Sequence, residues 1–268
     1  MATLPEMQQM AGDFFARHPD VRLAALGARE NAASMDLEPF GVPLHYYPAE
    51  EFPNLVERYR DANALAFPGD LALPGWVLSD LYLLPNAIGL LTCPGHFIDV
   101  PTRKRLNLHP DDLGIAAAYF CSPSIRPGAF IGVSLLSLVP RIVAGAWVKA
   151  LTLRMVRATE LRGVAQWRSP AVRVHTRMGP LRVVSGVPGT HEFRARSFVY
   201  ESDLSDPETW TRAMARKAAT APSEKIPATD SDALQALCER AEHGERIYVV
   251  PPGLDAGGNV LVRFGSAT

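Results

Sequence analysis

The chain has 268 residues, of which 47% are hydrophobic and 21% are charged, and its formal net charge at pH 7 is −1. This composition supports a sizeable folded core and excludes global disorder, and the length fits one large domain or two small ones. Nucleic acid is not expected as a partner, because binding to phosphates requires clustered Lys and Arg, and the chain has no long basic block.

Cysteine usage and the first residues indicate the compartment. Cys93, Cys121 and Cys238 are odd in number and widely spaced, without a C-x-x-C pattern, which fits a reducing compartment and gives no zinc signature. The start, MATLPEMQQM, lacks the cationic and apolar segments of a secretory signal. The most apolar window, residues 129–147, is interrupted by Pro and Arg, so a buried strand explains it better than a membrane span. We expect a cytoplasmic protein with no membrane partner and no metal.

The N-terminal part predicts a helix, a strand and a second helix. Residues 1–38 carry Met and Phe at helix-like spacing, which indicates an accessory helix. Residues 41–47 (GVPLHYY) predict a strand. Glu50 and Glu51 then open a helix to about residue 64, since acidic side chains favour the first turn of a helix.

The next segment predicts strands around an exposed insertion. Residues 76–92 contain two apolar runs, WVLSDLYLL and AIGLLT, which predict a hairpin or meander. Residues 94–113 contain several prolines and the basic run RKR, and predict a loop. A further apolar run at residues 115–121 precedes a long strand that begins at Ala129.

The middle of the chain alternates strand and helix. After the strand from Ala129, residues 145–161 predict a helix with one apolar face and one charged, solvent-facing side that includes Lys149. Residues 164–167 predict a strand and residues 169–179 a second helix. This order indicates a parallel β–α–β unit with an appended helix. The loop between the first strand and its helix is the place where a phosphate would bind.

The C-terminal part predicts strands and a small α/β extension. The runs LRVVSGV and SFVYESDL indicate two strands after Gly179. From residue 205, helical patterns at 207–219 and 230–243 flank a polar linker at 221–227, and the runs IYVV and NVLVRF indicate two more strands. We expect this extension to pack on the main sheet or on a partner subunit, so a homodimer is one option.

The strand-to-helix loop resembles the signature loop of the GNAT superfamily, the general N-acetyltransferases. That loop reads Q/R-x-x-G-x-G/A, and residues 141–146 read RIVAGA, with Arg141 first and Ala146 last. Ala144 departs from the pattern, because it stands where the first glycine is expected. The following helix resembles a family phrase that reads roughly N-x-x-A-x-x-x-Y-x-x-x-G-F, with Ser169 in place of the Asn and His175 in place of the Tyr.

The resemblance implies a fold and a domain plan. The fold class is α/β, with a mixed, mostly antiparallel central sheet that contains a parallel β–α–β unit, an N-terminal helix and a C-terminal α/β extension. The expected limits are an accessory helix over residues 1–38, a GNAT-like acyltransferase domain over residues 39–204 and the extension over residues 205–268.

The resemblance also implies a cofactor site. In the family, successive backbone N–H groups of the loop hold the pyrophosphate of coenzyme A. Carried onto this sequence, the expected site consists of Leu138, Val139, Arg141, Ile142, Val143, Ala144, Gly145, Ala146 and Ser169. A helix-forming φ suits Ala144, whereas a positive φ does not. The alternative is an ordinary strand-to-helix turn in which Arg141 meets a surface carboxylate.

Three residues are candidates for catalysis. His175 stands where the family Tyr protonates the departing thiolate, and an imidazole titrates near neutrality, so it suits proton exchange with thiolate or amine. Asp80, within an apolar run, is a candidate base, and Cys121 a candidate acyl acceptor. The alternatives are a satisfied core-edge histidine, a solvent-facing turn residue and a small core cysteine.

We expect an N-acyltransferase that uses acetyl-coenzyme A or another acyl-coenzyme A as co-substrate. A thioester on an acyl carrier protein is a second option for the donor, and the acceptor is the amine of a small molecule or a peptide. The three departures from the family motifs motivate the alternative of a GNAT-like fold that binds a ligand or acts on a thioester without acyl transfer. A structural or partner-binding protein is the third hypothesis.

Overall fold

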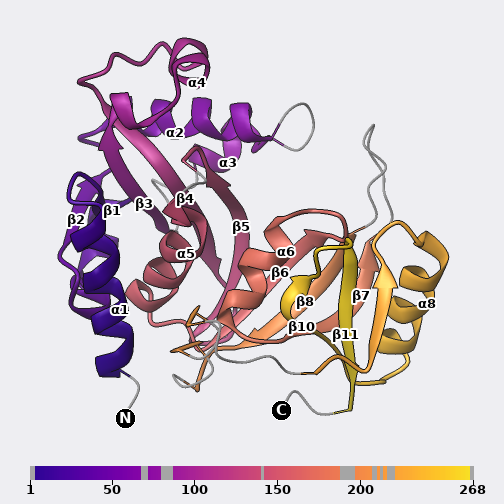
Figure 1. The fold of residues 1–268 in the computed structure, drawn as a ribbon. Coiled ribbons are helices and arrows are strands. Elements are labelled where there is room, and N and C mark those ends of the chain that lie inside the picture. The colour runs from indigo at the N-terminus through magenta and orange to yellow at the C-terminus, as the bar shows by residue number, and fades with distance from the viewer. Residues whose placement is uncertain are drawn as a thin grey trace. The chain divides into compact units, whose positions relative to one another are not determined.

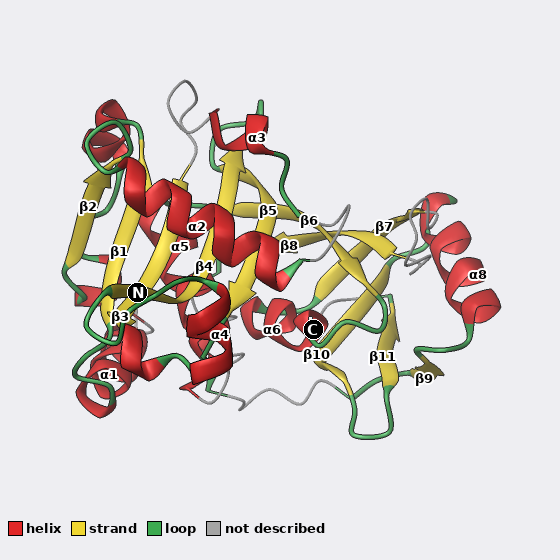
Figure 2. Cartoon of the chain, turned by 90° about the horizontal axis from the view of Figure 1, so that it is seen from above, coloured by secondary structure: helices red, strands yellow, loops and turns green. Residues whose placement is uncertain are grey.

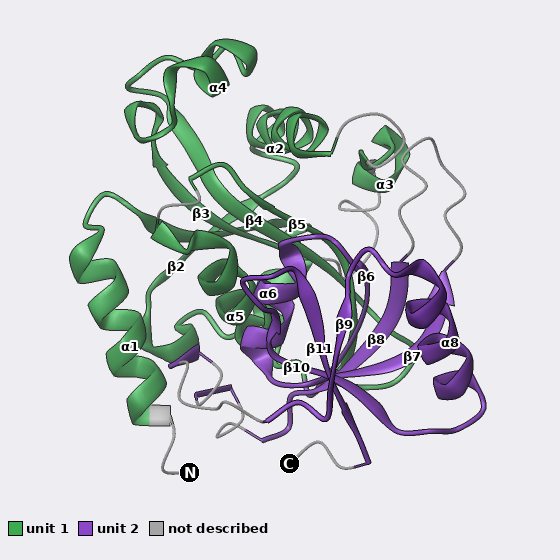
Figure 3. Cartoon of the chain, turned by 45° about the vertical axis from the view of Figure 1, so that its right-hand side comes forward, with its two compact units in different colours: residues 1–158 green, residues 159–268 purple. Residues whose placement is uncertain are grey.

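The computed structural model describes residues 4–67, 72–79, 87–139, 142–187, 197–206, 210–211, 214–215 and 221–265 (Figure 1). Strands and helices alternate along much of this chain (Figure 2). The chain separates into two compact units, unit 1 with residues 1–158 and unit 2 with residues 159–268 (Figure 3). The domain limits expected from the sequence stay a prediction.

Unit 1 is built on a mixed sheet. Its described strands are β1 (Arg22–Gly27), β2 (Leu44–Pro48), β3 (Ala87–Pro94), β4 (Leu113–Pro123) and β5 (Ala129–Ser137). They are ordered β2-β1-β3-β4-β5, with β1 parallel to β2 and the other neighbours antiparallel. Its described helical segments are α1 (Leu4–Arg17), η1 (Arg29–Ser34), η2 (Pro39–Gly41), α2 (Pro53–Ala66), α3 (Gly75–Ser79), η5 (Gly95–Phe97), α4 (Val100–Arg105) and α5 (Ala144–Met155).

The two faces of this sheet are covered by different helices. Successive strand residues point to opposite faces, and on β1 the buried Leu26 packs in the cluster that contains Tyr59 of α2. The neighbouring Ala25 packs instead with Met155 of α5. Helices α2 and α5 therefore cover opposite faces, and α5 lies against β3, β4 and β5.

The prediction that α5 has a solvent-exposed side is wrong. Every residue from Ala144 to Leu153 is buried, and the exposed fraction of Lys149 is 0%. The reason is a second layer on the far side of α5: the Phe14 ring of α1 lies 5.4 Å from the Trp147 ring, and η2 contacts both helices. The sequence analysis placed Lys149 on a solvent-facing side of the helix because the residue is charged, and this placement is wrong.

The prediction of one helix over residues 1–38 holds only for α1. Residues 22–27 form β1, an inner strand between β2 and β3. Its residues Leu23–Gly27 are buried, so the apolar run serves both faces. Periodicity alone does not separate such a run from a buried helical segment.

Other predicted elements are confirmed with shifted limits. The predicted strands at residues 41–47, 115–121 and from Ala129 are β2, β4 and β5. Helix α2 begins at Pro53, so Glu50 and Glu51 precede its first turn. Of the predicted hairpin at residues 76–92, the second run forms β3, the first begins as the helix α3, and residues 80–86 lie outside the described chain.

The region after β5 follows the predicted order of strand, helix, strand and helix. Helix α5 ends at Met155, earlier than expected, because the chain turns there and Arg157 adopts a positive φ of 54°. The next strand is β6 (Glu160–Gln166), followed by α6 (Ala171–His175) and the 3₁₀ turn η7 (Thr176–Met178).

Unit 2 has an antiparallel sheet that contains the C-terminal extension. Its further described elements are β7 (Leu181–Val187), β8 (Ser197–Asp203), β9 (Glu224–Pro227), α8 (Ser231–Glu242), β10 (Ile247–Leu254) and β11 (Asn259–Phe264). The strands are ordered β6-β8-β7-β10-β11-β9. Within unit 2, strand β10 of the extension pairs with β7. Strand β9 lies in the segment predicted as a linker, and residues 207–209, 212–213 and 216–220 of the predicted helix lie outside the described chain.

Candidate functional site

The turn from β5 to α5 has an unusual backbone. Val143, the N-cap of α5, adopts the left-handed conformation with φ 56° and ψ 27°. A β-branched side chain rarely adopts a positive φ, because its Cβ approaches the neighbouring carbonyl. Ala144 follows as the first helical residue, which agrees with the expectation that a helix-forming φ suits it. The positive φ is thus at the residue before the missing glycine.

The N–H groups of this turn fall into two sets, those of Leu138 and Val139 before the turn and those at the start of α5. Leu138 and Val139 both donate to the carbonyl of Ala116, at 2.8 and 3.2 Å, so they extend the pairing with β4 and are not available to a cofactor. The first N–H groups of a helix have no partner inside the helix. The N-cap residue Val143 makes no side-chain hydrogen bond to this end of α5. Within the described chain, the Val143 carbonyl accepts backbone hydrogen bonds only from the N–H groups of Ala146 and Trp147.

The chemistry of this turn suits an anion. A left-handed residue followed by a helical one turns successive N–H groups towards the same point, and a helix N-terminus adds a positive dipole end. Diphosphate is a ligand of this kind. Val143 is 46% exposed and Ala144 is fully buried, so solvent reaches this end of α5 at Val143. Arg141, the predicted cationic residue, lies outside the described chain.

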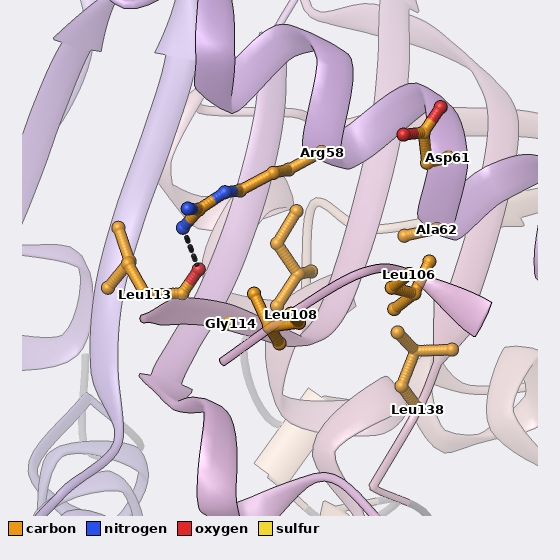
Figure 4. A pocket seen from close by; sticks show the side chains of 9 residues that line it. Arg58, Asp61, Ala62, Leu106, Leu108, Leu113, Gly114 and Leu138 are labelled. Atoms are coloured by element: carbon orange, nitrogen blue, oxygen red, sulfur yellow. Dashed lines mark hydrogen bonds between the residues drawn. The ribbon is translucent and has the colours of Figure 1, made fainter. Parts of the chain in front are cut away.

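A small cavity lies beside the end of β5. It has a volume of about 20 Å³ and is lined by Leu106, Leu108 and Leu138, with Arg58 and Asp61 of α2 among the other lining residues. Figure 4 shows the Asp61 carboxylate turned away from the leucines, while Arg58 donates to the Leu113 carbonyl at 2.5 Å. The volume is that of a single water molecule. Leu138 thus packs in unit 1, and this cavity does not hold an acyl chain.

His175 is placed at the end of α6 in a buried polar pair. Its exposed fraction is 7%, and its Nδ1 lies 3.1 Å from the hydroxyl of Tyr200 on β8. The two ring centres are 5.2 Å apart. On this segment Val172 and Met178 are buried, whereas Ala171 and Val174 are only partly buried. Sequence reasoning missed Tyr200, although the alternation in SFVYESDL places it on the buried face of β8.

Two further predicted site residues, Ser169 and Cys121, have structural roles. Ser169 accepts a hydrogen bond from the Ala171 N–H at 3.1 Å and so stabilises the start of α6. Cys121 is buried in β4, and burial raises the pKa of its thiol to about 12, which disfavours the reactive thiolate. Cys121 therefore has the environment of a core residue. Asp80 lies outside the described chain.

Unit 2 also has an acidic groove of about 630 Å³. Its lining includes Glu160, Arg182, Glu201, Asp203 and Tyr248. The Glu201 carboxylate accepts hydrogen bonds from Arg182 and from Arg162, one on each neighbouring strand. Because Glu201 is already paired twice, it is a structural carboxylate and a poor candidate for a general base.

The described chain has neither a metal-binding cluster of side chains nor a helix that could span a membrane. No group of three or more His, Cys, Asp and Glu side chains among these residues is arranged to hold a metal ion. No helix in the same ranges is long and apolar enough to cross a lipid bilayer.

No protein-family model and no curated protein matches this sequence. Among solved structures, the aminoglycoside 6'-N-acetyltransferase from Enterococcus faecium is 8% identical, with a TM-score of 0.38, and the match covers 57% of this chain and 92% of that one. Arabidopsis thaliana NAA60 in complex with acetyl-CoA is 10% identical, with a TM-score of 0.40 and coverages of 57% and 96%. Arabidopsis thaliana Naa50 with a bisubstrate analogue is 13% identical, with a TM-score of 0.41 and coverages of 69% and 99%. The chain is thus similar to these N-acetyltransferases over part of its length.

Proposed function

We propose that this chain is a divergent GNAT-like N-acyltransferase, which moves an acyl group from a coenzyme A or carrier-protein thioester to the amine of a small molecule or peptide. The observation that carries the proposal is the left-handed backbone of Val143. Non-glycine residues in this conformation cost about 1–3 kcal/mol and cluster at functional sites. Here the strain occurs in the segment RIVAGA, whose sequence resembles the pyrophosphate loop of the family.

The donor site is proposed to consist of the turn before α5. The N–H groups of Val143, Ala144 and Gly145 would hold the diphosphate, with Arg141 as the cationic partner. The proposed site also includes Ile142, Ala146 and Ser169. It does not include Leu138 and Val139, because their N–H groups donate to the carbonyl of Ala116. When bound, the acylated form of coenzyme A would supply the activated thioester.

His175 is proposed as the residue that handles the departing group. In the reaction, the amine nitrogen forms a bond to the thioester carbonyl carbon, the carbon–sulfur bond breaks, and its electron pair stays on sulfur. An imidazole placed near the sulfur stabilises the thiolate by hydrogen bonding or protonation. Asp80 stays the proposed general base, as the best candidate that the sequence offers, and it lies outside the described chain.

Titration of coenzyme A, followed by thermal unfolding, tests the donor site. Ligand at a hundred times its Kd stabilises the folded state by about 2.7 kcal/mol, which raises the melting temperature by several degrees. We expect this rise in the wild type and in a control, Arg60→Ala, which removes an exposed arginine of α2. The rise should be lost in Arg141→Ala. An equal rise in melting temperature in Arg60→Ala and Arg141→Ala would show that coenzyme A binds outside this loop.

Turnover tests the transfer step. Release of free thiol from an acyl-coenzyme A, measured across a panel of amines, should require the amine. His175→Ala should lower kcat much more than it lowers coenzyme affinity, and unchanged turnover would remove His175 from the mechanism.

One alternative is a fold that binds a thioester without transferring the acyl group. The burial of His175 favours it, because the thioester sulfur must reach this group for the proposed transfer to occur. A thermal shift with coenzyme A but no thiol release with any amine would support this alternative. No shift with any acyl thioester would support a structural or partner-binding protein instead, and a homodimer would then be the first assembly to test.

A further inference from the structure

Helix α4 of unit 1, which connects β3 to β4, borders a pocket of about 350 Å³ (Figure 1). A pocket of this volume suits a small organic ligand. The described residues that line it are Val100, Arg103, Lys104, Asn107, Leu108 and His109. This lining, which we call the α4 pocket, thus contains two cationic side chains and no carboxylate.

The backbone around the α4 pocket is fixed by hydrogen bonds. Asn107 follows the last turn of α4 with a positive φ of 49°, a conformation that Asn tolerates. Its N–H donates to the Lys104 carbonyl at 3.3 Å, and the Leu108 N–H donates to the Arg103 carbonyl at 3.0 Å. This pair of bonds is a Schellman motif, which turns the chain back at the helix end. Leu108 also lines the small cavity of Figure 4, so the loop is anchored in unit 1.

The cations of the α4 pocket are not neutralised by nearby acids. Within the described chain, neither Arg103 nor Lys104 forms an ion pair, and the buried Nε of Arg103 has no hydrogen-bond partner. The Asp99 carboxylate accepts from the Thr102 N–H at 3.0 Å, and bonds from Thr102 lower the pKa of this carboxyl more than the charge of Arg103 does. Asp112 pairs with an arginine of α2. A cleft that holds positive charge without a counter-ion attracts anions.

A purely structural role explains these cations less well. Basic side chains in the last turn of a helix complement its dipole. However, α4 has only six residues, and Arg105 of the same turn serves that role without lining the pocket. The concave arrangement of Arg103 and Lys104 therefore needs another explanation.

We propose that the α4 pocket binds a small organic molecule through a phosphate monoester. The planar guanidinium of Arg103 matches two phosphate oxygens, and Lys104 supplies a second charge, so the two cations balance a dianion. Val100, which is 51% exposed, and Leu108 offer apolar contacts to the organic part. The lining does not include the described residues of the turn before α5, so the proposal is independent of the proposed acyltransferase function.

Phenyl phosphate is the probe, added to the full, ¹⁵N-labelled chain at pH 7.5 and followed by NMR. A phosphate monoester is then mostly dianionic, because its second pKa is about 6. The amide signals within residues 100–109 should shift and saturate. Phenyl sulfate has the same shape but one negative charge, and should bind about ten-fold more weakly, because it loses one charge-assisted interaction.

Variants test which side chains bind the probe. Arg103→Gln should raise the Kd of phenyl phosphate about ten-fold, the effect of losing one charge-assisted hydrogen bond, and Arg103→Lys should retain part of the affinity. Val100→Ala should weaken phenyl phosphate and leave inorganic phosphate unchanged. The matched control is Arg60→Gln, which removes an exposed arginine of α2 and should change neither Kd.

Coenzyme A also carries a phosphate monoester, so a further pair of titrations separates two sources of the ligand. If the monoester is that of the coenzyme, Arg103→Gln should weaken coenzyme A and leave dephospho-coenzyme A unchanged. If it belongs to a separate molecule, Arg103→Gln should weaken phenyl phosphate alone. Either result supports the phosphate site.

Three results would overturn the proposal: shifts that do not saturate or that spread over other basic surfaces, equal binding of phenyl phosphate in Arg103→Gln and wild type, and equal affinities for phenyl phosphate and phenyl sulfate. A chain that binds phenyl phosphate as expected but does not respond to any coenzyme A thioester would keep this site and overturn only the proposed function.

Discussion

The ammonium nitrogen of Lys149 on α5 lies 5.7 Å from the centre of the Tyr119 ring on β4, and both residues are buried in unit 1. A ring face attracts a cation, but removal from water favours the neutral amine. Burial lowers the pKa of Lys149 to about 7. The helix that carries the proposed phosphate turn therefore contains a lysine whose charge changes near neutral pH.

This lysine should make stability depend on pH. In the unfolded chain the amine stays protonated up to its ordinary pKa of 10.5, so between pH 7 and 10.5 the folded state binds fewer protons and the free energy of unfolding rises with pH. Replacing Lys149 by Met should raise the free energy of unfolding at pH 6 by an amount on the order of 3 kcal/mol and flatten the rise. Urea unfolding at pH 6, 7.5 and 9 measures both effects. The control is Lys104→Met, at an exposed position of α4, and parallel curves for wild type and Lys149→Met would contradict the prediction.

The backbone strain at Val143 predicts opposite effects at two adjacent positions. Val143→Gly should raise the free energy of unfolding by about 1 kcal/mol, because glycine adopts a positive φ without steric cost. Ala144→Gly should lower it by up to about 1 kcal/mol, because that residue is helical. Thermal unfolding of the two variants compares them directly. The same sign for both would mean that Val143 is not strained in solution.

The contact between β3 and α5 predicts a steric defect. A β-carbon at Gly89 would lie 1.8 Å from Oγ1 and 2.8 Å from Cβ of Thr152. Gly89→Ala should therefore cost about 1–3 kcal/mol of stability through overpacking, and Thr152→Ala in the same chain should recover part of the loss. Gly12→Ala on α1, where a β-carbon meets nothing within 4 Å, is the control and should not destabilise. Additive losses at positions 89 and 152 would show that the two sites do not touch.

Glu201 predicts a loss of stability in acid. Burial raises the pKa of this carboxyl, but hydrogen bonds from Arg182 and Arg162 outweigh burial and hold the pKa below its usual value. The stabilisation is present above the ordinary pKa of a glutamate and is lost as the pH falls through the lowered folded-state value. Glu201→Gln should cost about 1 kcal/mol at pH 7, and the difference from wild type should shrink below pH 4. Denaturant unfolding between pH 3 and 7 tests this, with the exposed Glu57→Gln as the control.

The sequence allowed most of the elements to be predicted, because their patterns are local. Strand β5, the start of α5 and the strands β10 and β11 follow from apolar runs bounded by Gly and Pro. Strand β1 was missed because a strand buried on both faces has no alternation. Lys149 was assigned to solvent because the layer formed by α1 and η2 over α5 depends on tertiary packing, which no local pattern contains.

The candidate site was predicted in part. The resemblance led to the turn before α5, and the unusual conformation there falls at Val143, a residue that composition alone would not select. His175 was chosen by its position in a motif, but its partner Tyr200 was not, because the two are far apart in sequence and meet only through the packing of α6 on the sheet. Gly163 lies inside β6 and makes space for the Tyr200 ring, which no local sequence pattern indicates.

The pairing of β10 with β7 affects how the polypeptide folds during translation. The elements of unit 1 are all made before residue 159, so its sheet is able to form while the ribosome is still adding the rest. The sheet of unit 2 is completed only after residues 247–264 have left the exit tunnel, and until then the edge of β7 has no strand beside it. Nascent chains that stall between β8 and β10 would expose this edge to other chains, and such intermediates are the ones most in need of a chaperone.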